Sequence, residues 1–391
     1  MSGWSTVLLG DMASISRHGV DPTTLKPDTR YIGLEHIPTG GGTAATAILG
    51  EFDLASTKFA FTDRHVLFGK LRPNLGKVSR PGCSGVCSTD ILPILPGARL
   101  DAGYLAWFLR RPEVTAWAAG RTAGANLPRL SPAELVKLRV PLPPLEEQRR
   151  IAAVLDQVDA LRAKRRGAIA YLDTLPQAMF RDMFGDGEDA SVRRVGRFAA
   201  RKVSDVCELV VDCVNRTAPV VSGLTPYKML RTTNVRDGVV NTSEVRYVDA
   251  ATFERWNRRA TPRAGDVLLT REAPVGEVGV LETDEHVFLG QRLMLYRPDP
   301  LKITSEYLLA AFQSSYLQAQ FGKHGSGTTV KHLPLPACRS FLVPLPPLEL
   351  QAEFSRRVRA LRGLRSVSAE ELREWEALFD SLQHKAFVGA L

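Results

Sequence analysis

The stretch V-P-L-P-P-L-E-E-Q-R-R at Val140–Arg150 recurs almost unchanged as V-P-L-P-P-L-E-L-Q-A-E at Val343–Glu353. The two copies begin 203 residues apart in a chain of 391 residues. Solenoid repeats have periods of roughly 20–50 residues, so a spacing this long predicts a duplicated domain instead. The chain is therefore expected to consist of two similar halves.

Each copy is expected to mark the start of a long helix. Pro143 and Pro144 cannot lie in a helix interior but are tolerated in a first turn, so the first helix is predicted to begin near Pro144–Leu145. Glu146 and Glu147 then lie at the positive end of the helix dipole, where carboxylates are favourable. About 35–40 residues with helical apolar spacing follow, enough for a rod of about 50–60 Å at 1.5 Å per residue.

The apolar residues of both helices recur at steps of mostly three and four, which predicts a coiled-coil seam. Arg165 interrupts the first seam, and Arg357 and Glu371 interrupt the second. Polar residues at such positions fix the register of a coiled coil at some cost in stability. The residues expected to pack the two helices together are Ile151, Val154, Val158, Leu161, Leu172, Leu175, Phe354, Leu361, Leu364, Trp375, Leu378 and Leu382.

The remaining sequence repeats in the same order. Short β-rich pieces broken by Gly, Pro, Asp and Asn fill Trp4–Gly97, and a helical pattern covers Asp101–Glu113, which together predict a mixed helix and sheet domain. Tyr31 matches Tyr227 at a separation of 196 residues, which rises to 203 further along the chain. The loops of the globular parts therefore carry the insertions. The ends of the two long helices match at a separation of 207, which predicts one extra turn in the second helix.

Composition and charge limit the class of protein. The chain is 44% hydrophobic and 24% charged, as expected of a folded globular protein. It has no apolar run near the roughly 20 residues needed to cross a bilayer, and its first residues lack a signal-peptide pattern, so a cytoplasmic protein without membrane contact is expected. A formal charge of +9 favours a polyanionic partner such as nucleic acid, although it is also compatible with solubility alone.

Sequence patterns for catalysis or metal binding are missing. There is no G-x-x-x-x-G-K-[ST], H-E-x-x-H, G-x-S-x-G, dinucleotide fingerprint or Asn/Asp-Pro-Pro-Tyr motif, and the seven histidines are scattered. We therefore expect no catalytic residue, no metal site and no cofactor in this chain. The cysteines are odd in number and lack a paired C-x-x-C pattern, which predicts reduced and mostly buried thiols; they are Cys83, Cys87, Cys207, Cys213 and Cys338.

Several loops carry side chains suited to DNA. Arg and Lys can bind phosphate or the O6/N7 edge of guanine, and Asn can bind adenine. A solvated basic loop explains the same residues equally well. The candidates of the first half are Lys70, Arg72, Asn74, Lys77, Arg80, Arg121, Asn126 and Arg129; those of the second half are Arg231, Thr232, Asn234, Arg271, Gln291, Arg292, Thr328, Lys331 and His332.

The chain resembles the specificity subunit of type I restriction-modification systems over essentially its full length. The resemblance rests on the duplicated proline-rich stretch with its long helix, and on the runs V-C-S-T-D at Val86–Asp90 and L-G-Q-R-L-M-L-Y-R-P at Leu289–Pro298. The second copy departs from the first at Leu350, Ala352 and Glu353, where the first has a second Glu and an Arg pair. The matching loops differ between halves while the flanking sequence repeats, as two separate recognition specificities would require.

The resemblance implies an α+β fold with two globular target recognition domains (irregular β-sheet plus helices), separated by two long antiparallel coiled-coil helices in a pseudo-two-fold internal repeat. The expected division is 1–142 for the first recognition domain, 143–184 for the first spacer helix, 185–345 for the linker and second recognition domain, and 346–391 for the second spacer helix. Each recognition domain is expected to read half of a bipartite, asymmetric DNA site, with the helices setting the gap.

The resemblance also implies partners. Two modification subunits that carry S-adenosylmethionine are expected to bind the chain and methylate adenine in double-stranded DNA. Restriction subunits, where present, are expected to supply ATP- and Mg2+-dependent translocation and cleavage. Two alternatives remain open at this point: a coiled-coil scaffold that binds no DNA, and a part of a fused restriction-modification enzyme.

Overall fold

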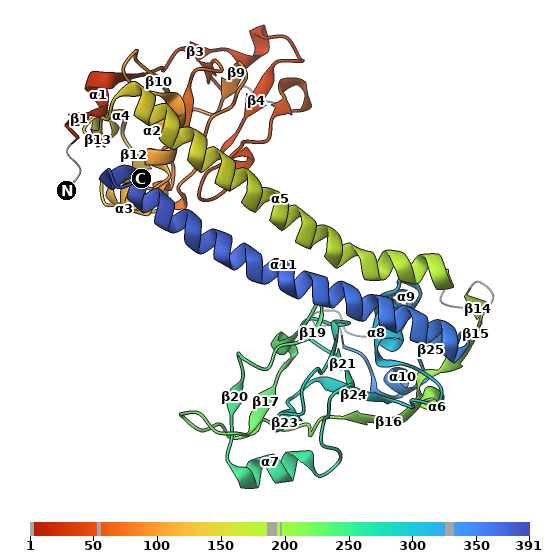
Figure 1. Ribbon diagram of the computed structural model, residues 1–391. Coiled ribbons are helices and arrows are strands. Elements are labelled where there is room, and N and C mark those ends of the chain that lie inside the picture. The colour runs from red at the N-terminus through yellow and green to blue at the C-terminus, as the bar shows by residue number, and fades with distance from the viewer. Residues whose placement is uncertain (1–3, 53–55, 186–193, 196–197, 325–331) are drawn as a thin grey trace. The chain divides into compact units, whose positions relative to one another are not determined.

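The two predicted long helices are α5 (Leu145–Phe184) and α11 (Leu348–Val388) (Figure 1). The computed structural model describes residues 4–52, 56–185, 194–195, 198–324 and 332–391. It divides into two compact units. Unit 1 comprises residues 1–166 and 370–391, and unit 2 comprises residues 167–369, so each long helix contributes one part to each unit.

The helices begin where their proline pairs end. α5 starts at Leu145, as predicted, and carries Glu146 and Glu147 in its first turn. It continues through Pro176, which has no backbone N–H to donate within the helix. The prediction that the second helix is one turn longer than the first is wrong, because α5 has 40 residues and α11 has 41.

Unit 1 is built on two sheets and four short helices. The four-stranded sheet has the order β2 (Ala13–Ile15), β10 (Ile91–Pro96), β7 (Val66–Gly69), β8 (Val78–Ser79). The five-stranded sheet has the order β3 (Gly19–Val20), β6 (Lys58–Phe61), β9 (Gly85–Cys87), β4 (Arg30–Ile32), β5 (Ala47–Ile48). The remaining elements are β1 (Thr6–Leu8) paired with β13 (Arg139–Pro141), β11 (Thr122–Ala123) paired with β12 (Arg129–Leu130), α1 (Leu9–Met12), α2 (Ala102–Leu109), α3 (Pro112–Ala119) and α4 (Pro132–Leu135).

Unit 2 repeats this plan with longer elements. Its six-stranded sheet has the order β16 (Cys207–Asp212), β24 (Leu293–Pro298), β21 (Val267–Thr270), β22 (Val278–Val280), β19 (Gly238–Val240), β18 (Val235–Arg236). Its two three-stranded sheets are β20 (Arg246–Tyr247), β17 (Lys228–Leu230), β23 (Val287–Leu289), and β14 (Arg194–Val195), β15 (Phe198–Lys202), β25 (Leu342–Pro344). The helices are α6 (Val203–Val206), α7 (Ala250–Asn257), α8 (Ser305–Gln313), α9 (Ser315–His324) and α10 (Leu335–Ser340).

The strand pairing confirms the internal repeat. The β2-β10-β7-β8 order of unit 1 corresponds to β16-β24-β21-β22 in unit 2, and both series are antiparallel. The parallel pair β4 and β9 corresponds to the parallel pair β17 and β23. One helical prediction needs correction: the segment predicted as one helix over Asp101–Glu113 is divided between α2 and α3, because Pro112 starts a new helix.

The proline-rich stretch is held by the same contacts in both units. The Gln148 side chain accepts a hydrogen bond from the Asp101 N–H (2.8 Å) and donates to the carbonyls of Arg99 (3.0 Å) and Pro143 (2.9 Å). Gln351 makes the same three bonds with Thr304, Lys302 and Pro346 in unit 2. Tyr104 donates its hydroxyl hydrogen to the Pro141 carbonyl, as Tyr307 does to that of Pro344. The stretch is therefore a joint between domain and helix, in which the side-chain amide of each glutamine is fully hydrogen-bonded.

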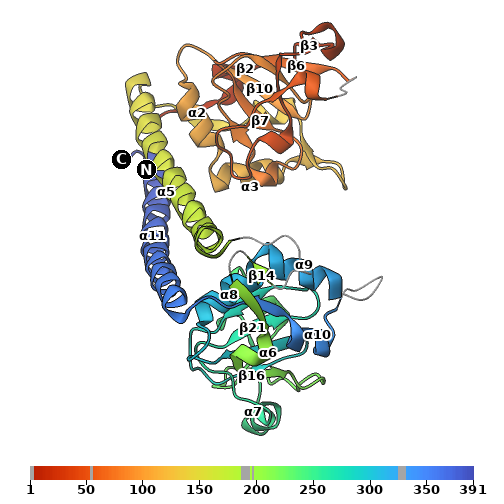
Figure 2. The same ribbon diagram turned by 90° about the vertical axis from the view of Figure 1, so that its right-hand side faces the viewer.

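Both long helices are part of the cores of the globular units. In unit 1, Ile151, Leu155 and Val158 of α5 and Phe379 and Phe387 of α11 join one buried cluster with the sheet and α2. Figure 2 shows α2 between this sheet and α5. In unit 2, Phe180 and Phe184 of α5 join Phe354 and Val358 of α11 in the corresponding cluster. The numbering runs in opposite directions along the two helices within each unit, so they are antiparallel there.

The predicted seam is only partly correct. Ile151, Val158 and Phe354 are buried, and the middle group of predicted residues is half-buried. Leu161, Leu364 and Leu378 are exposed to 47%, 58% and 45%. The apolar faces turn toward the domain cores at the helix ends, so a single two-helix seam does not run through all twelve positions. The half-buried group comprises Val154, Leu172, Leu175, Leu361, Trp375 and Leu382.

Ion pairs join α5 and α11 in the part of the helices where none of the described apolar side chains is buried. Arg165 pairs with Glu371 (2.8 Å) and Arg166 with Glu376 (2.7 Å) in unit 1. In unit 2, Arg365 pairs with Asp173 (2.5 Å). Two of the three charged residues that interrupt the predicted seam, Arg165 of α5 and Glu371 of α11, therefore neutralise each other.

The five cysteines are free, and all but the half-buried Cys207 are buried, as predicted. Burial raises the pKa of the Cys87 thiol to about 12. The Ser131 hydroxyl caps α4 by accepting a hydrogen bond from the Glu134 N–H (3.1 Å), which confirms the predicted helix start. None of the helices in the described part of the chain combines the length and apolar character needed to cross a bilayer.

Candidate nucleic-acid interface

The two units share one backbone arrangement at the end of their central hairpin, which we call the hairpin corner. In unit 1 it is formed by the residues after β7 (70–73), the residue before β10 (90) and the segment 128–130. The Lys70 N–H donates to the Asp90 carbonyl (2.9 Å), and the Leu130 N–H donates to the Lys70 carbonyl (2.9 Å). The Arg72 N–H donates to the Pro128 carbonyl (2.8 Å). The corner is thus a rigid framework of main-chain bonds.

The unit 2 corner has the same framework. It is formed by residues 271–274 after β21, residues 291–292 before β24, and the segment 332–333. The Arg271 N–H donates to the Arg292 carbonyl (2.8 Å), and the Leu333 N–H donates to the Arg271 carbonyl (3.0 Å). These bonds are the counterparts of the two that Lys70 makes in unit 1. The backbone is repeated while the side chains on it differ.

Polar and charged side chains gather at the unit 1 corner. Arg129 binds Asp90 through its Nε (2.9 Å) and one terminal nitrogen (3.3 Å), and this hydrogen bonding to the Asp90 carboxylate raises the pKa of Arg129 above its ordinary value. Arg72 is exposed and adopts a positive φ of 49°, a conformation uncommon for a residue with a side chain. Lys70 is half-buried. Asp90 was not among the predicted contacts, because a carboxylate alone does not suggest a DNA-binding loop.

The unit 2 corner is equally polar. Arg292, at a positive φ of 69°, pairs through its Nε with Glu272 (3.0 Å). Arg271 directs its Nε at the Leu333 carbonyl (2.8 Å), and Thr232 donates its hydroxyl hydrogen to the Ala273 carbonyl (3.2 Å). The structure therefore brings together Thr232, Arg271 and Arg292. Arg231 and Gln291 directly precede Thr232 and Arg292, and His332 directly precedes Leu333.

Three further candidates border the unit 1 corner. Arg121 lies two residues after the end of α3, with its guanidinium carbon 4.7 Å from the Trp117 ring centroid, and donates to the Trp117 carbonyl (3.2 Å). Asn126 is exposed in the turn between β11 and β12, and Asn74 is exposed in the turn after Arg72. All three are accessible to a partner. The candidates Thr328 and Lys331 lie outside the described residues.

Three of the predicted DNA contacts bind other groups of the protein in the structure. Asn234 is buried, and its side-chain amide donates to the carbonyls of Asn241 (3.1 Å) and Glu244 (2.8 Å), so it stabilises a turn. Lys77 is half-buried and donates from Nζ to the Leu34 carbonyl (2.6 Å). Arg80 binds Asp156 of α5 through both carboxylate oxygens (2.6 and 2.7 Å) and holds the domain to the helix. Sequence spacing placed Lys77 and Arg80 in one loop and Asn234 in a loop of the second half, but could not show where each side chain points.

Comparison with known proteins identifies the family. The model of the type I restriction modification DNA specificity domain matches residues 1–170 and 200–364. The chain belongs to this family. Its class of function is therefore DNA sequence recognition. Each unit of the structure holds most of one matched segment.

Several relatives are specificity subunits. The chain is 28% identical to the type I restriction enzyme EcoDI specificity subunit of Escherichia coli, over 47% of this chain and 42% of that protein. The match thus spans less than half of that relative. The chain is 22% identical to the type I restriction enzyme MjaVIII specificity subunit of Methanocaldococcus jannaschii, over 79% of this chain and 75% of that protein.

Solved structures confirm the fold. One, from a study of complex assembly and conformational transition of the type I R-M system, has a TM-score of 0.59 at 21% identity and covers 100% of this chain and 98% of its own. The S subunit of the type I system from M. genitalium has a TM-score of 0.61 at 12% identity, with 99% and 96% covered. The α+β fold with two long helices and an internal repeat is thus shared with specificity subunits.

Ion pairs between oppositely charged side chains hold each specificity domain to a long helix. In unit 1 the helix α5 carries the acids Asp156 and Asp159, and the domain supplies Arg80 and Arg110. Trp107 adds a hydrogen bond from its Nε1 to Asp156 (2.8 Å). These groups surround a hollow of about 520 Å³ between α2 and α5.

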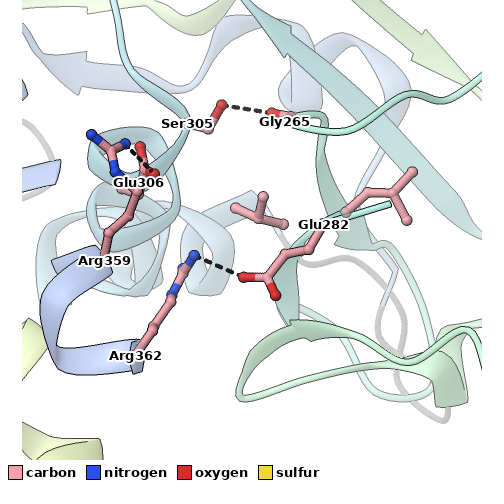
Figure 3. A pocket seen from close by; sticks show the side chains of 8 residues that line it. Gly265, Glu282, Ser305, Glu306, Arg359 and Arg362 are labelled. Atoms are coloured by element: carbon pink, nitrogen blue, oxygen red, sulfur yellow. Dashed lines mark hydrogen bonds and ion pairs between the residues drawn. The ribbon is translucent and has the colours of Figure 1, made fainter. Parts of the chain in front are cut away.

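In unit 2 the charges at this place are reversed. The helix α11 carries Arg359 and Arg362, each 203 residues after one of the acids of α5. Arg359 pairs with Glu306 (2.7 Å) and Arg362 with Glu282 (2.9 Å). Figure 3 shows both arginines extending from α11 to these carboxylates across a hollow of about 430 Å³. The repeat conserves the helix positions of these contacts, but the charges are reversed and the domain partners come from different positions.

Proposed function

We propose that the chain is the DNA-recognition subunit of a type I restriction-modification complex and that it binds a bipartite, asymmetric site in double-stranded DNA. Each specificity domain reads one half of the site with its hairpin corner. The observation that carries the proposal is the repetition of one backbone framework with different polar side chains on it. A shared framework with variable side chains is what two separate readers of sequence need, because base edges are distinguished by hydrogen-bonding side chains.

The candidate contacts divide by the task that their chemistry suits. Arg72 and Arg121 are exposed cations that suit phosphate oxygens, which fix position but carry no sequence information. Asn74 and Asn126 can form paired hydrogen bonds with adenine. The net charge of +9 supports binding to DNA through release of counterions.

The chemistry is proposed to reside in partner subunits. Two modification subunits with S-adenosylmethionine methylate adenine, and restriction subunits, where the system has them, use ATP and Mg2+ to translocate and cleave DNA. The lack of nucleotide-binding and methyltransferase motifs in this sequence supports a non-catalytic role. The related structure from a study of complex assembly supports the presence of partners. A cytoplasmic location fits a protein that acts on the genome.

The test is selection of DNA from a random library by the complete complex, with methylome sequencing of expressing cells as a second readout. We expect two short fixed motifs around a constant gap. Arg72→Ala, at the corner, should weaken binding, whereas Arg373→Ala, on the exposed face of α11, should not. Intact assembly with partner subunits but no enrichment of any sequence would reject the proposal.

A further inference from the structure

Each hairpin corner contains one arginine held by one carboxylate. In unit 1 Arg129 binds Asp90, and in unit 2 Arg292 binds Glu272. Both arginine side chains are 42% exposed, whereas the carboxylates are 25% and 20% exposed. In each pair the carboxylate is therefore the more shielded member, and the guanidinium faces outward.

The two pairs are not a simple copy of each other. Asp90 and Arg292 each directly precede the equivalent strand, β10 or β24, and their carbonyls accept the equivalent hydrogen bonds. The partner of Asp90 comes from β12, whereas the partner of Arg292 comes from the segment after β21. The residue directly before the strand is therefore an acid, Asp90, in unit 1 and a base, Arg292, in unit 2. The same arginine-carboxylate pair is thus assembled twice from different positions.

The geometry leaves each arginine able to bind a second group. Asp90 accepts hydrogen bonds from Nε and one terminal nitrogen of Arg129, and the other terminal nitrogen donates to the Leu127 carbonyl (3.4 Å). Nε of Arg292 lies 3.0 Å from a Glu272 carboxylate oxygen. A guanidinium has five N–H donors in a planar fork, so donors remain on the edge away from the carboxylate. That edge has the spacing needed for two hydrogen bonds to guanine O6 and N7. A carboxylate that fixes the fork lowers the entropy lost on binding.

A carboxylate at a DNA-binding surface also repels phosphate. Its presence therefore weakens binding to DNA of any sequence while it orients one base-reading side chain. This combination favours specificity over affinity.

We propose that Arg129 and Arg292 each read a guanine, one in each half of the site, and that Asp90 and Glu272 are positioning residues that hold these arginines in the reading orientation. The inference rests on the proposed function and names the base and the residues that read it.

The experiment uses the full chain in the assembled complex, with DNA selection and binding measured on the selected site and on its single-base variants. Arg129→Lys keeps the charge but removes the fork, so preference for guanine at one position of the first half-motif should fall about 10-fold or more. The second half-motif should be unchanged. Arg292→Lys should give the reverse result.

The positioning role has its own readout. Asp90→Asn should reduce the preference for guanine at the same position that Arg129→Lys affects, while affinity for non-specific DNA stays equal or rises. Glu113→Gln is the matched control, since it removes a carboxylate paired with Arg111 (3.1 Å) elsewhere in unit 1. Asp90→Glu should restore part of the preference. Thermal unfolding of each variant checks that the fold is retained.

The outcomes separate the two proposals. If motifs are recovered and both arginine variants leave them unchanged, the inference is wrong and the proposed function stands. If Asp90→Asn lowers binding equally on all sequences, Asp90 is a structural residue and its positioning role is rejected. If no motif is recovered with any form of the complex, both proposals fall together.

Discussion

At the scale of single residues, the two buried glutamines of the proline-rich stretch carry the joint between domain and helix. Gln148 and Gln351 are 0% exposed, and each makes three hydrogen bonds with main-chain groups. A buried polar group is costly unless all its partners are present. The glutamine is therefore needed at this position for the loop ahead of α2 to meet the start of α5.

Gln148→Ala should lower the free energy of unfolding by about 2–3 kcal/mol, because the Asp101 N–H and two carbonyls lose their partner. Urea denaturation measures this change. Gln157→Ala is the matched control, since Gln157 is exposed on the same helix, and it should change stability by less than about 0.5 kcal/mol. Equal effects of the two variants would contradict this role for Gln148.

His65 should make stability depend on pH. The side chain is buried, its Nδ1 accepts from the Thr62 N–H (3.0 Å), and its Nε2 lies 3.0 Å from the Ser16 hydroxyl oxygen. Burial lowers the pKa of His65 below its ordinary value of 6.5. The unfolded chain therefore takes up the proton more readily, so this contribution is present above pH 6.5 and is lost as the pH falls below it.

The measurement is the free energy of unfolding of the wild type and His65→Gln at pH 7.5 and pH 5.5. The wild type should lose more stability than the variant between these two values. A variant that loses as much as the wild type would show that other groups cause the pH dependence.

At the scale of elements, the reversed charges where domain and helix meet make the two helices non-equivalent. The apolar contacts and the glutamine bonds are common to both units, whereas the acids of α5 and the arginines of α11 are not interchangeable. An arginine at position 156, as at the equivalent position 359 of α11, would face Arg80 and leave the Trp107 Nε1–H without its acceptor. Like charges in close contact are unfavourable, and a buried donor without a partner adds to the cost.

Asp156→Arg should therefore lower the free energy of unfolding of unit 1 by about 2–4 kcal/mol. Differential scanning calorimetry of the full chain measures this loss. Gln157→Arg introduces the same side chain at the next, exposed position and should have little effect. A second change, Arg80→Glu, should recover part of the loss by restoring opposite charges; no recovery would show that the sign of the pair is unimportant.

At the scale of the whole molecule, the two long helices are proposed to set the gap between the half-sites. Seven residues inserted in each helix, after Gly167 and after Ser368, preserve the heptad register and add about 10 Å. The gap should lengthen by about three base pairs, since one turn of DNA covers 10–10.5 base pairs in about 34–36 Å. Selection from a random library reports both gap and half-motifs; altered half-motifs at an unchanged gap would reject the idea of a ruler.

The sequence alone determined the duplication, the starts of the long helices and the absence of catalytic motifs. These features are local or repetitive: Pro144 and Leu145 define a helix start by backbone chemistry, and two matching stretches reveal a repeat without any knowledge of contacts. The family resemblance followed from the same residues.

Only the tertiary structure decided which side chains lie at the hairpin corners. Lys77, Arg80 and Arg72 belong to one basic segment, yet Lys77 donates to the Leu34 carbonyl, Arg80 binds Asp156 of α5 and Arg72 lies at the hairpin corner. Their directions depend on neighbours distant in sequence. Leu161 fits the heptad pattern but is exposed, since the helices share their apolar faces with the globular cores. The repeated stretch Val140–Arg150 predicted the start of a long helix, but only the fold showed that Gln148 joins the domain to this helix with three hydrogen bonds.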